Sequence, residues 1–403
     1  MSGRHLASTC SWIETIKTID SYASTMPSPS SEIWVVYSCE RLQQCLTFSL
    51  LASTIGKMTS LDDKEAAIMD SPASSSQQST PTSTMLVDHR TNRSIPTFLL
   101  HHLIRPFGAK LISPGKTFPA GSPRLTAHNT AKRRCHIQER VVEGMYLYDL
   151  RPKKSANSDR GRNEKRKKRI YYFAGGGWQM PASSDHWVFC AAIANEVPNT
   201  TVTVVSYPLA PNSPAPVCFG ALTKLYRKLL QDATEAGEEF LLAGDSAGGN
   251  IVLCLTLAAL KEDESLPAPK AILVLSPSCD LSRDNPAIEE LEQYDPILRV
   301  WFVKDSAAKW RGEWDAADPR VTPLHADVSL LARKGVHVHG VFGRYDILSP
   351  DVTLFQEKLE QAGVTGEWLI WEKQMHVFPL AWPYLLPESI AAKKWIIDLL
   401  KRS

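Results

Sequence analysis

A serine flanked by glycines is the clearest sign of chemistry in this chain. The sequence at 244–250 reads GDSAGGN, with an apolar run at 240–243 before it and a helical run at 251–260 after it. A strand, a sharp turn and a helix with a serine at the turn are typical of a nucleophile elbow, in which the next backbone N–H faces the reacting carbonyl. A short GxSxG motif also arises by chance, so the interpretation depends on this context and on partners elsewhere. The pattern places Ser246 at the apex and Ala247 just behind it.

Three consecutive glycines follow a run that is typical of a buried strand. The run RIYYF at 169–173 leads into Ala174 and then into Gly175, Gly176 and Gly177. Such a loop leaves backbone N–H groups available to an anion, and donors of this kind stabilise the oxyanion of acyl transfer. A flexible turn without a role is the alternative. The position of the loop upstream of the serine favours an oxyanion loop.

An acid and a histidine come after the serine. A predicted strand at 335–342 ends shortly before Asp346, and His376 follows a predicted helix at 352–361 and a strand at 367–371. An acid just past a strand end is well placed to orient an imidazole, and serine, acid, histidine is a known order for such triads. Asp351 competes for the acid role on the same loop, but it lies further from the strand end.

These motifs resemble the hormone-sensitive-lipase-like branch of the α/β-hydrolases (α/β-hydrolase fold-3), in a fungal-type esterase form related to steryl acetyl hydrolases. The resemblance covers about residues 95–400 and includes YPLAP at 207–211, LSPSCDL at 275–281, DP at 318–319, TPL at 322–324 and the acid loop at 343–351. It implies an α/β-hydrolase fold, with a mostly parallel eight-stranded sheet flanked by helices and a small helical cap. It also implies Ser246 as nucleophile, His376 as general base and then acid, and Asp346 as the orienting carboxylate.

The resemblance places the oxyanion donors among Gly175, Gly176, Gly177 and Ala247. One departure concerns the residue before the glycines, where family members usually carry a histidine that braces the loop and this chain has Ala174. The donors themselves are backbone groups, so we expect activity to persist, with the loop braced by other packing, from Trp178 or Trp187. No metal and no organic cofactor are implied.

Together the motifs and the resemblance predict a serine carboxylic-ester hydrolase that acts by two-step acyl transfer on a small-to-medium apolar ester. A tailoring step in fungal secondary metabolism is one role open to it. Two alternatives stay open, because a fold does not fix a function. One is a non-catalytic ligand-binding protein on a hydrolase scaffold, against which the presence of Ser246, Asp346 and His376 together argues. The other is an enzyme of this fold that catalyses a biosynthetic condensation, cyclisation or elimination.

Composition limits the choice of partners. With 403 residues, 43% of them hydrophobic, the chain can bury a large core, and a net charge of +2 implies no nucleic-acid or anionic-membrane partner. A small-molecule ester is the expected partner, and the oligomeric state is left open. The basic cluster at 153–169 lies between predicted strands at 141–150 and 170–173, which favours a solvated hairpin insertion over a nuclear signal.

Cysteine and histidine spacing gives no sign of a metal or a disulfide scaffold. The eight cysteines are scattered singly, without a CxxC pair. His337 and His339 alternate along a predicted strand and so share a face, but no third ligand is adjacent in the sequence. Plain strand positions are therefore the favoured interpretation.

The chain divides into two parts of different composition. Residues 1–90 are expected to be a disordered or poorly structured N-terminal extension with a low-complexity tract at 71–84, and residues 91–403 an α/β-hydrolase domain. The apolar run at 33–55 is interrupted by charges and falls short of a membrane span, and the first twenty residues lack the apolar region of a secretory signal. The expected location is therefore the cytoplasm. The extension is either a regulatory tail or the product of a translation start assigned too early, in which case Met58 or Met85 is the first residue of the protein.

A cap over the serine is expected from elements near 95–130 and 285–314. The run IPTFLLHHLI at 95–104 predicts a short amphipathic helix. The second segment is rich in large apolar residues, namely Tyr294, Ile297, Leu298, Val300, Trp301, Phe302 and Trp310. They indicate either a site for an apolar acyl or polycyclic ligand, or packing that attaches the cap to the core.

Overall fold

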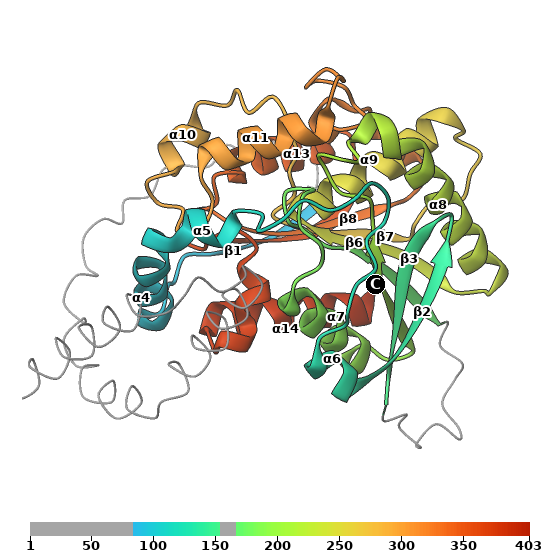
Figure 1. Cartoon of the computed structure of the whole chain (residues 1–403), viewed down its shortest axis with the longest axis horizontal. Coiled ribbons are helices and arrows are strands. Elements are labelled where there is room, and N and C mark those ends of the chain that lie inside the picture. The colour runs from blue at the N-terminus through green and yellow to red at the C-terminus, as the bar shows by residue number, and fades with distance from the viewer. Residues whose placement is uncertain (1–83, 154–166) are drawn as a thin grey trace, which may run out of the picture. The chain divides into compact units, whose positions relative to one another are not determined.

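Two strands expected from the sequence, one leading into the serine and one leading into the glycine loop, lie next to each other in the middle of one sheet. Figure 1 shows this sheet and the helices around it. The computed structural model describes residues 84–153 and 167–403. These residues form a nine-stranded sheet in the order β1-β9-β8-β7-β6-β4-β5-β3-β2. The strands are β1 (Met85–Arg90), β2 (Cys135–Val142), β3 (Met145–Pro152), β4 (Lys168–Phe173), β5 (Thr200–Ser206), β6 (Glu239–Asp245), β7 (Ala271–Leu275), β8 (His337–Gly343) and β9 (Gly366–Trp371).

The strands from β1 through β5 in this order pair in parallel, and β3 and β2 add an antiparallel edge. The interior strands are apolar runs buried on both faces, as a parallel sheet covered by helices requires. Because the carboxyl ends of parallel strands share one edge, the loops after β4, β6, β7, β8 and β9 meet there. Ligands of open α/β sheets bind at that edge.

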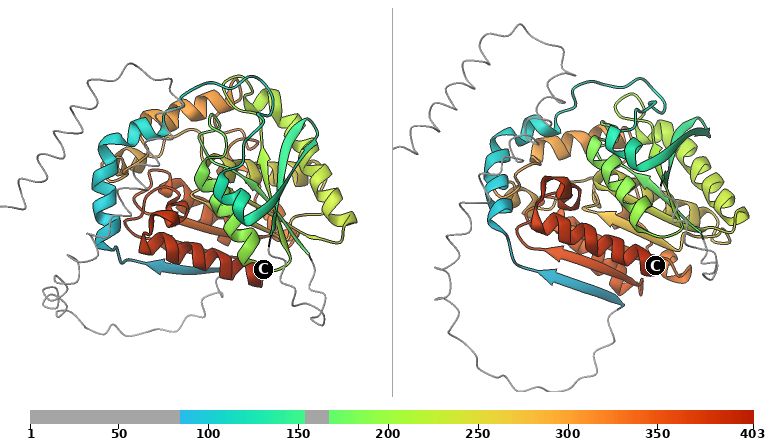
Figure 2. Two further views of the ribbon diagram at one scale, coloured as in Figure 1. Left: turned by 60° about the horizontal axis from the view of Figure 1, so that its bottom comes forward. Right: turned by 90° about the horizontal axis from the view of Figure 1, so that it is seen from below.

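Helices cover both faces of the sheet (Figures 1 and 2). The α-helices of the described residues are α4 (Ile95–Ile104), α5 (Gly108–Ile112), α6 (Asn129–Arg134), α7 (Ser184–Glu196), α8 (Ala215–Glu235), α9 (Ser246–Glu262), α10 (Ala287–Leu291), α11 (Val300–Arg311), α12 (Ser329–Arg333), α13 (Ser349–Gln361) and α14 (Pro387–Arg402). Short 3₁₀ helices are η1 (Arg105–Phe107), η2 (Pro323–His325) and η3 (Phe378–Tyr384). One face carries α8, α9 and α13, and the other carries α6, α7 and α14.

The alternation of side chains along β4 shows how the core is divided. Tyr171 and Phe173 belong to the apolar cluster on the α8 and α9 side, whereas Ile170 and Tyr172 belong to the cluster on the α7 and α14 side. Successive side chains of a strand point to opposite faces, so an apolar run such as this one contributes to both layers. The expected α/β-hydrolase fold is confirmed.

Two expectations about the sheet need correction. The sheet has nine strands rather than eight, because β1 adds to its edge in parallel to β9, with Met85 opposite Gly366. This strand falls inside the segment 1–90 that was expected to lack structure, so the folded part begins by residue 85. Six residues with exposed Leu86 and Val87 carry too little pattern to be recognised beside a low-complexity tract. The expectations for residues 1–83 lie outside the described residues.

The predicted strand at 141–150 is in fact parts of two strands. β2 and β3 are joined by a turn at Glu143 and Gly144, whose φ angles are 50° and 74°. β3 then pairs with β5, which lies between β3 and β4 in the sheet. The two strands that flank the basic segment, β3 and β4, are therefore not neighbours in the sheet and do not form the expected hairpin. Residues 154–166 of that segment lie outside the described residues.

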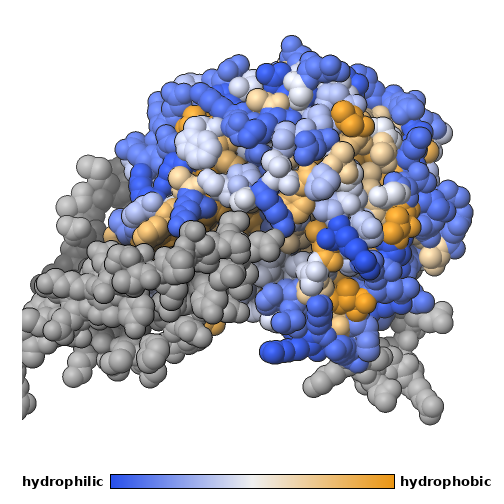
Figure 3. All heavy atoms as spheres, in the orientation of Figure 1, coloured by the Kyte–Doolittle hydropathy of each residue, from blue (hydrophilic) through white to orange (hydrophobic). Residues whose placement is uncertain are grey.

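The helix predicted at 95–104 is confirmed as α4, which begins after the N-cap Ser94. The two expected cap segments touch each other: the Arg299 guanidinium donates to the carbonyl of Arg105 at 2.7 Å, and a Cβ on Gly108 would lie 2.5 Å from the carbonyl oxygen of Pro296. The face shown in Figure 3 is mostly hydrophilic, with apolar residues scattered over it. Among the described helices, none has the length and hydropathy needed to cross a bilayer.

Candidate active site

The turn between β6 and α9 holds Ser246 in a strained backbone conformation with φ at 51°. A non-glycine residue in this region is uncommon, and strain of this kind is typical of nucleophile elbows. The flanking glycines are required by close packing. A Cβ on Gly244 would lie 2.6 Å from the carbonyl of Gly248, and a Cβ on Gly248 would lie 1.9 Å from the carbonyl oxygen of Phe173. The GxSxG spacing thus lets β4, β6 and α9 meet at the serine.

Asp346 and His376, which lie thirty residues apart in the sequence, are brought together by the loops after β8 and β9. The Nδ1 atom of His376 lies 2.7 Å from Oδ2 of Asp346, and Oδ1 of Asp346 accepts the N–H of Leu348 at 2.9 Å. The two loops also bond directly, since the N–H of Tyr345 donates to the carbonyl of Gln374 at 3.0 Å. The carboxylate of Asp346 is fully buried and held from both sides, as an orienting acid would need to be.

The loop after β7 connects this histidine loop to the serine turn. The N–H of Val377 donates to Oγ of Ser276 at 3.1 Å, and the N–H of Ser278 donates to the carbonyl of Ser246 at 3.1 Å. The amide of Asn250, the last residue of GDSAGGN, donates to the carbonyls of Ser278 and Val321 at 2.8 and 2.7 Å. These contacts give the motif LSPSCDL a positioning role at the site.

The environment of His376 raises the pKa of its imidazole. Burial lowers this pKa, but the charge of Asp346, its hydrogen bond to Nδ1 and the nearby Asp295 outweigh that effect. Asp295 itself is fully buried, and its carboxylate accepts the N–H groups of Ile297, Leu298 and Ile347 at 2.8 to 3.1 Å. Burial, together with the charge of Asp346, raises the pKa of Asp295 to about 7. Asp295 was not predicted as a site residue, because its link to the site runs through Ile347 and Asp346, which lie in the loop after β8.

One of the expected oxyanion donors is already used. The N–H of Gly175 donates to Oδ1 of Asp245 at 3.0 Å, which corrects its inclusion in the donor set. Gly176 and Gly177 have φ angles of 127° and 58°, and no acceptor for their N–H groups is found within residues 84–153 and 167–403. Ala247 lies in the first turn of α9, where N–H groups have no intrahelical acceptor. Gly176, Gly177 and Ala247 therefore remain as candidate donors.

The glycine loop is braced by hydrogen bonds as well as by packing of Trp178, one of the two tryptophans expected to support it. The hydroxyl of Tyr207, from the motif YPLAP, donates to the carbonyl of Ala174 at 2.7 Å. The N–H of Ala210 donates to the carbonyl of Trp178 at 2.8 Å. The indole of Trp178 adds a contact with the cap by stacking on Trp310, whereas Trp187 packs edge-on against Tyr148.

A buried ion pair beneath the glycine loop was not predicted. His186 of α7 lies with Nε2 3.1 Å from Oδ2 of Asp245, whose Oδ1 also accepts the hydroxyl of Tyr172 at 2.7 Å. Burial lowers the pKa of His186, but the charge of Asp245 outweighs it, so this pKa is raised. Because Asp245 also accepts the N–H of Gly175, this imidazole is linked through one carboxylate to the glycine loop. Of the two residues in this ion pair, only Asp245 lies in a motif that the sequence analysis recognised, GDSAGGN.

A small cavity lies beside Ser246, with space of about 20 Å³, which holds about one water molecule. Its walls include Gly177, Ser278 and Arg283 from the core loops, and Leu298 and Phe302 from the cap. The two interpretations of the apolar cap residues thus apply to different residues. Leu298 and Phe302 face the cavity, Trp310 packs on Trp178, and Tyr294 and Trp301 remain 46% and 52% exposed.

The cysteines and the paired histidines of the described residues form neither a disulfide nor a metal site. Cys135, Cys190, Cys218, Cys254 and Cys279 are buried thiols without a disulfide partner in the described part of the chain. No group of three or more His, Cys, Asp or Glu side chains suited to a metal ion occurs among residues 84–153 and 167–403. His337 and His339 do share a face, and their rings stack at 6.1 Å.

Comparisons with known proteins agree with this fold and with a hydrolase site. A model of the alpha/beta hydrolase fold family matches residues 170–380. The chain belongs to this family. It is 28% identical over 207 residues to an esterase of Acinetobacter venetianus, which covers 49% of this chain and 66% of that protein. It is also 28% identical over 175 residues to the hormone-sensitive lipase of Ictidomys tridecemlineatus, which covers 42% of this chain and 22% of the lipase.

Solved structures agree on the fold. The crystal structure of an esterase from the bacterial hormone-sensitive lipase family superposes with a TM-score of 0.61 at 22% identity, covering 77% of this chain and 99% of that one. The resemblance to the hormone-sensitive-lipase-like α/β-hydrolases that the motifs indicated is confirmed. The chain spans less than two thirds of the length of each of these two curated relatives. The match to the family model at 170–380 includes the glycine loop, the serine elbow and the acid and histidine loops.

Proposed function

We propose that this protein is a serine carboxylic-ester hydrolase. The observation that carries the proposal is the 2.7 Å hydrogen bond between His376 and Asp346, on loops that are bonded through Ser276 and Ser278 to the Ser246 turn. A buried acid bonded to an imidazole, on loops that are joined by hydrogen bonds to the turn of a strained serine, fits the arrangement used for acyl transfer. The esterase names of its relatives support the same activity.

In the proposed mechanism Ser246 Oγ attacks the ester carbonyl and His376 accepts the hydroxyl proton. The N–H groups of Gly176, Gly177 and Ala247 hold the oxyanion, and His376 then gives its proton to the leaving alcohol. A water molecule next attacks the acyl-enzyme while His376 takes its proton, and the acid leaves as Ser246 regains its hydrogen. The apolar cap side chains Leu298 and Phe302 at the cavity favour an apolar group next to the carbonyl.

A panel of p-nitrophenyl esters from acetyl to palmitoyl tests the proposal. We expect hydrolysis of at least one short or medium ester, together with covalent labelling of Ser246 by an organophosphonate, located by mass spectrometry. A non-catalytic binding protein would hydrolyse none of them. Labelling at a different serine would contradict the mechanism even if hydrolysis were found.

The pH dependence follows from the raised pKa of His376. The general base must be neutral, so kcat/KM is expected to fall as the pH is lowered through that pKa, with a midpoint above 6.5. Because the charge of Asp295 contributes to the upward shift, Asp295→Asn should move the midpoint to lower pH. The measurement is kcat/KM against pH for one neutral ester.

The exposed Asp284 supplies the control for charge alone. Asp284→Asn removes one carboxylate from the loop after β7 and should leave the midpoint in place. A midpoint below 6.5 in the native protein, or equal shifts in both variants, would contradict this account of the imidazole.

A further inference from the structure

Arg283 is buried beside the serine, although no sequence motif singled it out. It lies in the loop between β7 and α10, its side chain is only 2% exposed, and its backbone adopts a φ of 57°. A non-glycine residue with positive φ is strained, and such residues cluster at functional sites. Arg283 and Ser246 line the same small cavity.

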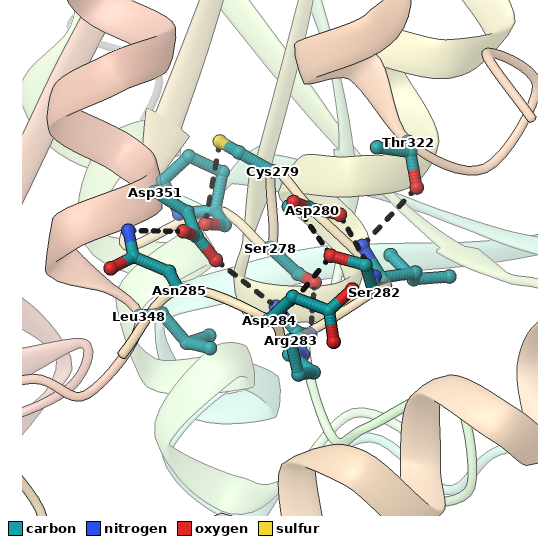
Figure 4. A network of polar contacts seen from close by, with 12 residues as sticks. Ser278, Cys279, Asp280, Ser282, Arg283, Asp284, Asn285, Thr322, Leu348 and Asp351 are labelled. Carbon is teal, nitrogen blue, oxygen red and sulfur yellow. Dashed lines mark hydrogen bonds and ion pairs between the residues drawn. The ribbon is translucent and has the colours of Figure 1, made fainter. Parts of the chain in front are cut away.

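The guanidinium of Arg283 has few partners (Figure 4). Its Nη2 donates to Oγ of Ser278 at 2.6 Å, and its Nη1 lies 3.9 Å from Oδ2 of Asp351, beyond hydrogen-bond reach. Nε and Nη1 have no hydrogen-bond partner within the described residues. Asp351 turns its other oxygen to the amide of Asn285, which donates to Oδ1 at 2.9 Å.

This arrangement is poor for a purely structural arginine. Burying a guanidinium is unfavourable unless its charge and its N–H donors are matched by nearby groups. Elsewhere in this protein Arg169 comes closer to that condition, since it bonds Glu238 at 2.8 and 3.2 Å. Its Nη1 also lacks a hydrogen bond, but it lies 3.4 Å from the carboxylate of Asp149. Arg283, which is better buried, has one hydrogen bond to a hydroxyl and a loosely placed carboxylate.

From this geometry we infer that Arg283 binds a carboxylate group of the substrate, so that the site selects esters which carry a second, anionic carboxylate on the acyl or the alcohol part. Guanidinium N–H groups match a carboxylate in both shape and charge, and such hydrogen bonds are stronger than neutral ones. The apolar side chains of Leu298, Phe302 and Leu348 line the same cavity, and they suit the hydrocarbon part of such an ester.

The inference rests on the proposed function. It also requires cap side chains to move when the ester binds. The cavity beside Ser246 holds about one water molecule, and Phe302 and Val303 of α11 form part of its wall. An ester with a short spacer between its two carbonyl groups must therefore displace side chains of α11. The core-side groups Ser246 and Arg283 can stay in place, since both belong to loops anchored on the sheet.

Matched pairs of esters test the inference by exchanging one methyl group for a carboxylate. Monoethyl glutarate against ethyl pentanoate places the charge on the acyl part, and γ-acetoxybutyrate against butyl acetate places it on the alcohol part. Acid release is followed by titration at constant pH. For at least one pair we expect the charged ester to have the higher kcat/KM, by about tenfold or more, as expected for a hydrogen bond to a charged group.

The variant Arg283→Met keeps the length of the side chain and removes its charge, so the charged-to-neutral ratio should fall at least about tenfold. Because this change leaves Asp351 buried without its cation, the double variant Arg283→Met/Asp351→Asn is made alongside it and should show the same fall. Arg140→Met is the matched control, since it removes one positive charge that pairs with Asp149 away from the cavity, and it should keep the native ratio.

A binding measurement separates this inference from the proposed function. In Ser246→Ala, calorimetric titration with monoethyl glutarate and with γ-acetoxybutyrate should show binding of the favoured ester, and adding Arg283→Met/Asp351→Asn should weaken it at least about tenfold. Hydrolysis of the neutral esters with no preference for either charged one would overturn the inference and leave the proposed function standing. Absence of all hydrolysis would overturn the proposed function. The binding measurement alone would then show whether Arg283 binds a carboxylate. Binding that ignores the double substitution would also overturn the inference.

Discussion

Replacing Ser246 with alanine is expected to abolish ester hydrolysis while the domain stays folded. In the proposed mechanism the hydroxyl forms the covalent intermediate, and loss of the serine in a comparable triad lowers kcat on the order of 10⁶-fold. The side chain is only half-buried at the turn, and its removal breaks no hydrogen bond of the core. Alanine should therefore have little effect on the free energy of unfolding.

The measurement combines steady-state kinetics with a denaturant unfolding curve. Thr223→Ala is a suitable control, since its hydroxyl bonds the carbonyl of Phe219 within α8, away from the site, and activity should persist. Hydrolysis that is undiminished in Ser246→Ala would show that another group is the nucleophile. A large loss of stability would show that the serine has a structural role that its contacts do not reveal.

The parts of the site that sequence reasoning found are those set by local geometry. The elbow depends on glycines two residues before and after Ser246, and this spacing is visible in seven consecutive residues. Asp346 and His376 are distant in sequence, but each follows a buried strand of recognisable pattern. Because parallel strands deliver their following loops to one edge, the order of elements was enough to expect the two residues together.

The parts that it missed depend on contacts between side chains from different elements. The bond from the N–H of Gly175 to Asp245 is made across two neighbouring strands, and it takes away a donor that the glycine pattern alone counts as available. His186 reaches the same carboxylate from α7, and no spacing rule links it to Ala174. Packing decides the direction of these side chains, and it leaves no periodic pattern that can be recognised in a single sequence.

The sheet edges were the least predictable part of the fold. β1 is a six-residue edge strand whose consecutive apolar residues Leu86 and Val87 are both exposed, so it shows neither the buried run of a central strand nor strict alternation. The hairpin turn at Glu143 and Gly144 was overlooked because the residues on both sides of it are strand-like. In contrast α4 was predicted with its observed ends from its closely spaced apolar residues. The serine before the helix and the proline in its first turn agree with the observed start.

Replacing Asp346 with asparagine is expected to lower kcat by about 10⁴-fold, as the same change does in a well-studied triad. An asparagine there can still accept the N–H of Leu348 with its oxygen, but it then turns an NH₂ group toward Nδ1 of His376. The imidazole is thereby held with its proton on Nε2, and it can no longer take the proton of the serine. KM should change little, because Asp346 is fully buried and does not line the cavity.

Asp351→Asn is the matched comparison, because it removes the other carboxylate of the same loop. Its partners are Asn285 and Arg283. The substitution leaves the buried charge of Arg283 without its partner, so the free energy of unfolding should fall by about 3 to 5 kcal/mol. The two variants should therefore separate: Asp346→Asn keeps a near-native unfolding midpoint and loses turnover, and Asp351→Asn unfolds earlier but turns over a neutral ester when folded. If turnover per folded molecule fell more in Asp351→Asn, the orienting acid would be Asp351, and the hydrogen bond between Asp346 and His376 would have no catalytic role.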